Sequence, residues 1–371
     1  MAPQVITAEK SLDHRLVFLD YLRIFSFISV LIGHKFYSQL SQWSDSPMLH
    51  ATPKLLMQLV LPAFWNGGTG VAVFFIISGY IISNVLIKES TSTFLFKRIF
   101  RIYPLYIAAL LCQLAVDHFL FHQPFPGMRV VFAQMTLLGD FLHAPYALSG
   151  VEWTLRIEIA FYLFMAVLKS VGVLNQYRRL LPWAMLAATW GLSMMPPIPS
   201  FNGVFLGYFT IYAPILFIGV YFTLFERKEI NLFWLILFIG AILYQYFEMI
   251  ALYWPTWLGS HFVAIALSIF ISAWIGRKHL QATPLVLLLS NLTFSVYLFH
   301  NWAWTPIKIF FEKLSLKILP ADIQALFGLF ILCYIMHKTV ERKGIQLGSQ
   351  LLSNWKNRKR GMPLDSAKKM V

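Results

Sequence analysis

Arg23 and His34 are two ionisable side chains in a segment that otherwise has membrane character, DYLRIFSFISVLIGHKFY over residues 20–37. Eleven residues of α-helix make almost three full turns, so both side chains lie on one face, roughly 16 Å apart along the axis. Ionisable groups inside a span cost on the order of 3 kcal/mol and usually face a cavity or a partner. One face that carries both predicts the two ends of a polar channel, where an imidazole suits general-base chemistry.

Both side chains also have a structural interpretation. Asp20 lies three residues before Arg23, at a spacing where an Asp–Arg pair would satisfy both charges. His34 could instead be an interfacial histidine that contacts lipid headgroups. Its place beside Gly33, on the face of Arg23, favours the functional interpretation of His34, whereas the two interpretations of Arg23 stay open.

A buried carboxylate is expected in the stretch VEWTLRIEIAFYLF, residues 151–164. Glu158 falls inside a predicted span, and Tyr162 follows one turn later on the same face. Such a carboxylate is costly unless it is paired. Arg156 is only two residues away and points elsewhere, so we expect the partner on another helix, for which the helix of the first pair is one candidate. Trp153 marks the outer membrane interface.

Two arginines lie side by side in FLFKRIFRIYPLY, residues 94–106. Arg98 and Arg101 are three residues apart and share one helical face at the predicted inner end of a span. Guanidinium forks suit phosphate oxygens because each fork can donate two parallel hydrogen bonds. The alternative is plain topology anchoring by basic residues within an aromatic belt.

Two further positions could contact a ligand. Ser78 and Gly79 make a small polar notch in the apolar sequence GTGVAVFFIISGY, although such residues also mark ordinary helix packing in membranes. His300, in SVYLFHNW, lies at the predicted outer end of another span, at a depth close to that of the first histidine. It could equally be a histidine of the interfacial belt.

Metal and nucleotide chemistry of the common kinds is not expected. His118 and His122 are spaced as helical neighbours, but no third ligand is evident for zinc. Cys112 and Cys333 share no motif and are interpreted as packing residues. The sequence contains no phosphate-binding glycine loop of the nucleotide-hydrolase or dinucleotide type.

These residues are set in a strongly apolar chain of 371 residues, 58% hydrophobic and 12% charged, with mean hydropathy +0.66. A soluble domain is about one quarter charged, so the composition predicts an all-α polytopic membrane protein. The polar residues 1–15 do not resemble a cleavable signal. We expect about ten transmembrane helices, near residues 16–40, 67–87, 102–120, 152–169, 181–196, 203–225, 231–250, 258–276, 284–304 and 322–340.

The distribution of lysine and arginine predicts the orientation. With the N-terminus inside, 22 of the 30 Lys and Arg residues fall in inner segments, six in outer segments and two within spans. This bias predicts that both termini are cytoplasmic. It also explains the net charge of +14 by orientation and contact with membrane lipids, so a nucleic-acid partner is not expected.

Five motifs in this order resemble the acyltransferase-3 family of integral membrane O-acyltransferases. They are LDYLR with a histidine eleven residues after its arginine, then GVAVFFIISGY, KRIFRIYPLY, WTLRIEIAFY and SVYLFH. The resemblance covers nearly all of residues 16–341, which we expect to be one transmembrane domain between a tail at 1–15 and a basic cytoplasmic tail at 342–371. Thr154 differs from the serine of the family's usual W-S-L.

The resemblance implies an enzyme of a bacterial inner membrane that transfers an acyl group from cytoplasmic acyl-CoA, most simply acetyl-CoA, without a metal. The acceptor would be a hydroxyl of a surface polysaccharide, a lipopolysaccharide or a lipid-linked sugar. The expected catalytic residues are Arg23, His34 and Glu158. The expected donor contacts are Arg98, Arg101, Ser78 and Gly79, and the expected acceptor contacts are His300, Trp153 and Tyr162.

Several alternatives stay open at this point. Direct transfer and a covalent acyl-His34 intermediate both fit. Intramembrane Arg, His and Glu also build proton-coupled permeases, and a glycan flippase would need no chemistry. Within the enzyme class, the acceptor could be a small molecule such as a macrolide, the acyl group could be succinyl or longer, and the chain could act as a homo-oligomer.

Overall fold

Every regular element in the computed structural model is helical within the residues that it describes, so the predicted all-α class is confirmed. Helices satisfy their backbone hydrogen bonds internally, which is what an apolar chain in a bilayer requires. The predicted tail at 1–15 and the end of the basic tail after residue 359 lie outside this description. The described residues are 16–176, 178–200, 206–257, 259–315 and 319–359.

Six helical segments are long and apolar enough to cross a membrane, and a seventh is counted if α14 and α15 form one bent span. Each of the ten predicted segments contains a helix, but three of these helices are shorter or more charged than the other seven. The number ten and the inner location of both termini therefore stay predictions. The six segments are Val17–Lys35, Ala51–Lys88, Thr91–Phe119, Tyr208–Glu226, Leu232–Tyr253 and Ala321–Arg358.

The chain divides into two compact units, with boundaries inside α5 and α14. Unit 1 comprises residues 1–77 and 261–293. Its described elements are α2 (Val17–Lys35), α3 (Tyr37–Asp45), α4 (Ala51–Val60), η1 (Leu61–Gly67), the start of α5 (Gly68–Lys88), α13 (Phe262–Ile275), η4 (Gly276–Lys278) and most of α14 (Pro284–Phe299).

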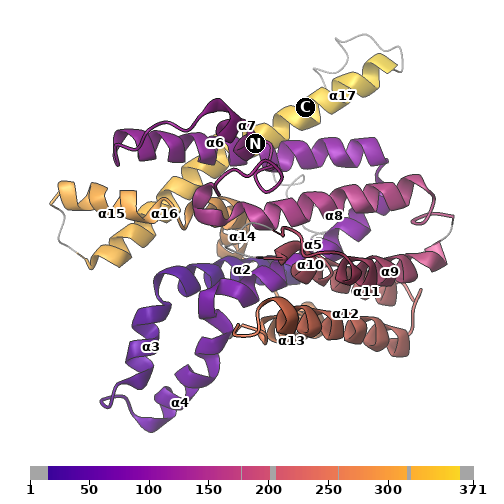
Figure 1. Cartoon of the computed structure of the whole chain (residues 1–371), viewed down its shortest axis with the longest axis horizontal. Helices are drawn as coiled ribbons and strands as arrows, with labels where there is room; N and C mark the ends of the chain where they lie inside the picture. Colours follow the sequence, from indigo (N-terminus) through magenta and orange to yellow (C-terminus); the bar gives the residue numbers. More distant parts are fainter. Residues whose placement is uncertain (1–15, 177, 201–205, 258, 316–318, 360–371) are drawn as a thin grey trace, which may run out of the picture. The chain divides into compact units, whose positions relative to one another are not determined.

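In unit 1, α2 packs against η1 and α13, and α3 and α4 form a hairpin (Figure 1). Edge-to-face rings join α2 to α13, with the centroids of Phe18 and Phe270 6.2 Å apart. Close backbone contact joins α2 to η1, because a Cβ on Gly33 would lie 2.2 Å from the backbone nitrogen of Gly67 and 2.5 Å from the carbonyl oxygen of Phe64. This contact fixes the end of α2 that carries His34.

Unit 2 comprises residues 78–260 and 294–371 and holds the longer helices. Within it, α9, α11 and α12 lie side by side, and α15 pairs with α16 (Figure 1). Its elements, besides the ends of α5 and α14, are α6 (Thr91–Phe119), α7 (Met128–Met135), η2 (Leu148–Gly150), α8 (Glu152–Ser170), η3 (Arg178–Leu180), α9 (Leu181–Met194), α10 (Tyr208–Tyr212), α11 (Ile215–Glu226), α12 (Leu232–Tyr253), α15 (Trp304–Lys313), α16 (Ala321–Met336), the π-helical turn η5 (His337–Glu341) and α17 (Arg342–Lys359).

Residues 342–359 form the helix α17, where the sequence predicted a basic tail. Gly344 and Gly348 allow its contact with α6, because a Cβ at these positions would lie 2.8 Å from Pro104 and 2.6 Å from Phe100. The sequence did not predict this contact, because the segment is basic and the two glycines that permit the contact are not hydrophobic.

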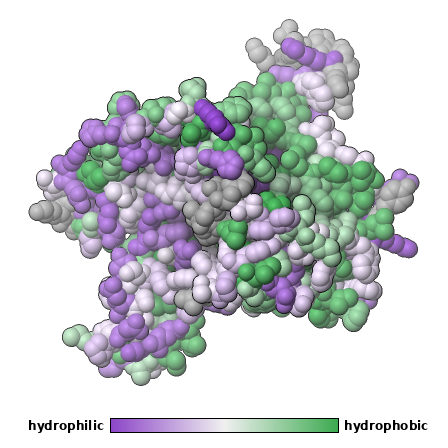
Figure 2. Space-filling model, viewed as in Figure 1, coloured by the Kyte–Doolittle hydropathy of each residue, from purple (hydrophilic) through white to green (hydrophobic). Residues whose placement is uncertain are grey.

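Large apolar side chains are exposed along several helices, and hydrophobic residues reach the surface over much of the face drawn in Figure 2. They recur three or four residues apart, which places them on one side of each helix. Lipid-facing helices have this pattern. Examples are Leu163 and Val167 on α8, Phe233 and Ile236 on α12, and Phe327 and Ile331 on α16.

The contact at Gly33 predicts a loss of stability in Gly33→Ala. A methyl group there meets backbone atoms on η1, which cannot rotate away, so we expect a loss of about 1–3 kcal/mol and a melting temperature several degrees lower. Thermal unfolding of the detergent-purified protein measures this. The control is Gly191→Ala on α9, where an added Cβ meets nothing within 4 Å and should be neutral or slightly stabilising. Equal melting temperatures for the two variants would contradict the contact.

Candidate functional site

Arg23 and His34 both belong to the unbroken helix α2. The rise of an α-helix therefore separates them by roughly 16 Å along the axis, as the spacing predicted. The side chain of His34 is exposed, whereas that of Arg23 is two-thirds buried, with 33% of its surface accessible. His34 is thus positioned at one end of α2 with its ring accessible to a substrate.

Asp20 is the polar centre of the other end of α2. Its side chain is 1% exposed, and it accepts a hydrogen bond from Ser290 Oγ at 2.6 Å. Arg23 Nη1 lies 3.4 Å from the same carboxylate oxygen. The structural interpretation of Arg23, a local pair with Asp20, is therefore present in the fold, and any additional role on a substrate stays a prediction.

In unit 2, three of the predicted site residues, Ser78, Arg98 and Tyr162, lie around a fourth, Glu158 on α8. This carboxylate is buried and accepts hydrogen bonds from Ser78 Oγ at 2.8 Å and from the Tyr162 hydroxyl. The guanidinium of Arg98 on α6 lies over the Tyr162 ring, 5.7 Å from its centroid, and over Phe94 at 5.2 Å. The sequence predicted a partner for Glu158 on another helix, and Ser78 of α5 is such a partner.

Arg98 has capacity left for a ligand. Its Nε is buried and has no hydrogen-bond partner among the described residues. In the part of the chain that the structure describes, no carboxylate forms an ion pair with Arg98. A partly buried guanidinium with such a buried Nε favours an anion that binds beside it, such as a phosphate.

Arg101 is engaged differently from Arg98. Its Nη1 forms an ion pair of 2.9 Å with Glu341, which is 1% exposed and lies in the π-helical turn η5. The other oxygen of Glu341 is 2.9 Å from His337 Nδ1 and accepts a hydrogen bond from Ser295 at 3.1 Å. The two arginines of the predicted phosphate pair therefore differ, because one is held by a buried carboxylate.

Gly79 has a packing role. An added Cβ would lie 1.7 Å from the carbonyl oxygen of Leu216, so the glycine permits close approach of α5 and α11 in unit 2. Its neighbour Ser78 points its hydroxyl at Glu158. A role of Gly79 in binding the donor stays a prediction.

His300 is buried at the end of α14. Its Nδ1 lies 2.7 Å from the carbonyl oxygen of Tyr297, which can only accept, so in the neutral ring Nδ1 carries the proton and Nε2 is an acceptor. Tyr297 in turn hydrogen-bonds Thr154 at 2.6 Å and the carbonyl of Val151 at 3.1 Å. This ties His300 to the start of α8, and the Thr154 hydroxyl serves there as a serine would.

A second site on α8 lies around Arg156. Arg156 Nη1 pairs with Asp140 at 2.9 Å, and its Nε donates to the carbonyl of Leu137 at 3.0 Å. The Tyr208 hydroxyl donates to the same Asp140 oxygen at 2.5 Å. Trp153, a predicted acceptor contact, packs edge-to-face on Tyr208 with ring centroids 5.4 Å apart.

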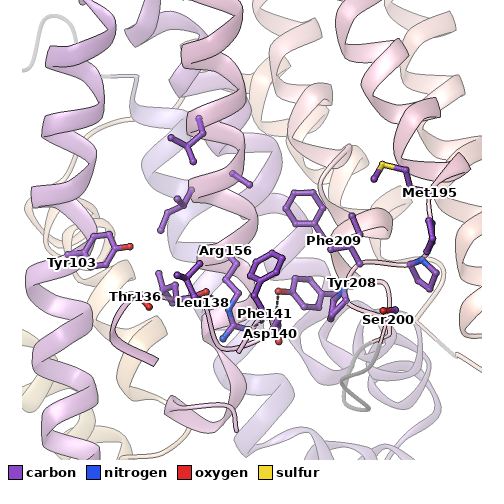
Figure 3. A pocket seen from close by; sticks show the side chains of 18 residues that line it. Tyr103, Thr136, Leu138, Asp140, Phe141, Arg156, Met195, Ser200, Tyr208 and Phe209 are labelled. Carbon is purple, nitrogen blue, oxygen red and sulfur yellow. Dashed lines mark hydrogen bonds and ion pairs between the residues drawn. The ribbon is translucent and has the colours of Figure 1, made fainter. Parts of the chain in front are cut away.

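Arg156, Asp140 and Tyr208 form the polar end of a cavity of about 580 Å³ (Figure 3). The remainder of its wall is mainly apolar, and it includes exposed residues on the loops at 136–141 and 195–200. Such a cavity could hold an apolar molecule with one polar end. Its apolar lining includes Leu138, Phe141, Leu163, Met195 and Phe209.

Sequence reasoning missed Asp140, Glu341 and Tyr208. Acidic residues number only 16 in the chain, so each one in an apolar region was a signal for a buried pair. The partner could not be found, because Arg101 and Glu341 are brought together only by the packing of α6 against η5. Among the described residues no group of three His, Cys, Asp or Glu side chains is arranged to hold a metal ion.

An all-helical membrane fold with buried carboxylate clusters defines the class of protein, a multi-pass membrane protein with ionisable groups between its helices. Residues 16–338 match the family model described as an acyltransferase domain. The chain belongs to this family, the acyltransferase-3 family, and is an acyltransferase. The resemblance found from the five motifs is thereby confirmed.

Two curated proteins illustrate the similarity. Nodulation protein 10 of Rhizobium leguminosarum bv. viciae is 23% identical over 325 residues, which are 79% of this chain and 83% of that protein. Acyltransferase MdmB of Streptomyces mycarofaciens is 28% identical over 158 residues, which are 40% of this chain and 38% of that protein. No solved structure matches the chain.

The different surroundings of the two arginines predict different stabilities for Arg101→Gln and Arg98→Gln. The first leaves the buried Glu341 without its cationic partner and should lower the melting temperature, by the equivalent of about 1–3 kcal/mol. Arg98→Gln should lower the melting temperature less, because this substitution breaks no ion pair among the described residues. Adding Glu341→Gln to Arg101→Gln should recover part of the loss, with a coupling of about 1 kcal/mol. Strictly additive losses in thermal unfolding would contradict the pair.

Proposed function

We propose that the chain is an inner-membrane O-acyltransferase. It transfers an acyl group, most simply acetyl from acetyl-CoA, to a hydroxyl of a cell-surface glycan or a lipid-linked sugar. Membership of the acyltransferase family supports the reaction class. The observation that carries the donor assignment is the Arg98 guanidinium, whose buried Nε lacks a hydrogen-bond partner among the described residues.

The proposal assigns the donor phosphates to Arg98 in unit 2. The Tyr162 ring supports this guanidinium from one side. Glu158 accepts hydrogen bonds from the Tyr162 hydroxyl and from Ser78, which holds the cluster in place. Arg101 assists by its charge, but its main partner is Glu341. The proposed donor site therefore depends mainly on Arg98 and less on Arg101.

The proposal assigns the proton transfer to His34 in unit 1. An exposed imidazole takes the proton from the acceptor hydroxyl, whose oxygen attacks the thioester carbonyl carbon. The carbon–sulfur bond then breaks, and the imidazolium returns the proton to the leaving CoA thiolate. Arg23 at the other end of α2 pairs with Asp20, and His300 in unit 2 is assigned a contact with a hydroxyl of the acceptor.

We further propose ten spans with both termini in the cytoplasm of a bacterial cell. The Lys and Arg bias supports the orientation. Helices within all ten predicted segments support the number. The orientation would place the basic ends of α6 and α11 on the side where acyl-CoA is found.

His34→Ala tests the base. A general base contributes typically 10²–10⁴-fold, so kcat for acyl transfer should fall at least 100-fold while the amount of folded protein in the membrane is unchanged. Transfer of radiolabelled acetyl from acetyl-CoA in membranes from a deletion strain measures this. The control is His279→Ala, an exposed histidine of the same unit, which should keep wild-type activity. Wild-type kcat in His34→Ala would exclude the role.

Arg98→Gln tests the donor site. It should raise the KM for acetyl-CoA roughly tenfold or more, a loss of about 1.4 kcal/mol in binding. It should also weaken thermal stabilisation of the purified protein by CoA. The matched control is Lys97→Gln, which removes one charge from the same helix at an exposed lysine paired with Glu89.

If Arg98→Gln leaves the KM for acetyl-CoA at the wild-type value, the arginine is a topology anchor and the donor binds elsewhere. If CoA fails to stabilise the wild-type protein at all, the donor assignment fails as a whole. Mass spectrometry of surface glycans from the deletion strain then identifies the acceptor, since it shows which acyl group is lost and from which hydroxyl.

A further inference from the structure

Unit 2 contains a second cavity, of about 680 Å³, where η3, the end of α11 and the start of α12 meet. None of its lining residues belongs to the cluster around Glu158 or lines the cavity at Arg156. Four cationic side chains line it together with a single carboxylate, that of Glu229. The cations are Arg178, Arg179, Arg227 and Lys228.

The positive charges of this basic cavity are only partly neutralised within the fold. Glu229 pairs with Arg178 at 2.7 Å, and Arg227 Nη2 donates to the neutral amide oxygen of Asn84 at 2.7 Å. Arg178 Nε is buried and has no hydrogen-bond partner among the described residues. Burial and the neighbouring Arg178 charge lower the pKa of the Arg227 guanidinium, as expected for cations held close together.

The backbone at the end of α11 holds a lysine where a glycine would be more stable. Lys228 has φ +58°, in the left-handed region, and it ends the helix with hydrogen bonds from Lys228 N to the Phe225 carbonyl and from Glu229 N to the Leu224 carbonyl. Glycine is the usual residue at this position of a helix end. The lysine side chain is therefore kept in the cavity at a local cost in backbone energy.

One wall of the basic cavity is aromatic. Trp183 and Trp234 lie edge-to-face with ring centroids 5.4 Å apart, and Trp234 stacks on Phe238 at 5.6 Å. Trp183 is 47% exposed. Tryptophan with this combination of packing and exposure is typical of the boundary between lipid headgroups and acyl chains. Large apolar neighbours, Leu180 and Phe233, are also exposed there.

We propose that the basic cavity binds the phosphate group of an anionic membrane lipid. The guanidinium groups of Arg178 and Arg227 and the ammonium of Lys228 bind phosphate oxygens, and Trp183 and Trp234 contact the glycerol and the first part of an acyl chain. Inorganic phosphate and CoA could make the same phosphate contacts, but neither carries an acyl chain that would contact the exposed apolar residues Leu180, Trp183 and Phe233. The site is independent of the acyl-transfer reaction and uses none of its residues.

Reconstitution with defined lipids tests this site. The wild-type protein is placed in nanodiscs of phosphatidylcholine, with or without phosphatidylglycerol, and its melting temperature is measured. Phosphatidylglycerol should raise it by several degrees. Arg227→Gln/Lys228→Gly should lose at least half of that shift. Lys356→Gln/Arg358→Gln, which removes the same charge from exposed positions of α17, should keep it.

The single variant Lys228→Gly is the control for misfolding. Glycine adopts the left-handed backbone without strain, so this variant should not have a lower melting temperature in phosphatidylcholine. This variant should still respond less to phosphatidylglycerol than the wild type. The proposal is overturned if the cavity variants keep the full lipid shift. It is also overturned if inorganic phosphate or CoA in detergent stabilises the wild type but not the cavity variants, because the ligand is then a soluble phosphate compound.

Discussion

The structure depends on the cost of an ionised carboxylate in a medium that excludes water. Burying such a group unpaired would cost far more than the few kcal/mol by which proteins are stable, so each one requires donors from neighbouring helices. The same solution recurs in both units, where a buried carboxylate accepts from a hydroxyl and lies beside a cationic side chain. The sets are Asp20 with Ser290 and Arg23, Glu341 with Ser295 and Arg101, Asp140 with Tyr208 and Arg156, and Glu158 with Ser78, Tyr162 and the nearby Arg98.

This pairing decides which polar groups are available for chemistry. In three of the four sets the cation forms an ion pair with the carboxylate, which fixes the geometry of the helices. Arg98 differs, because it lies on an aromatic ring and keeps a buried Nε without a partner among the described residues. His34 differs too, because its ring is exposed at the end of a helix that Gly33 holds against η1. The proposed reaction uses these two groups, Arg98 and His34.

Basic residues serve three distinct purposes in this chain. The bias in their distribution predicts orientation, which is a property of the sequence alone. Arg101 neutralises a buried carboxylate and so stabilises the packing of α6 against η5. Arg178, Arg227 and Lys228 gather around a cavity with too little negative charge of its own, which favours an anionic ligand. Only the first purpose can be recognised without coordinates, because the other two depend on what lies opposite each charge.

The sequence by itself determined the helical membrane class, the family and the continuity of α2, because hydropathy, helical period and motif order are local properties. It also indicated that Glu158 needs a partner. Only the tertiary structure decided that this partner is Ser78, 80 residues away, and that Arg101 belongs to Glu341. The packing of α17 on α6, the Arg156 cavity and the basic cavity were likewise hidden, since each arises where helices distant in sequence meet. A single chain records which charges must be satisfied, whereas the fold determines which residues satisfy them.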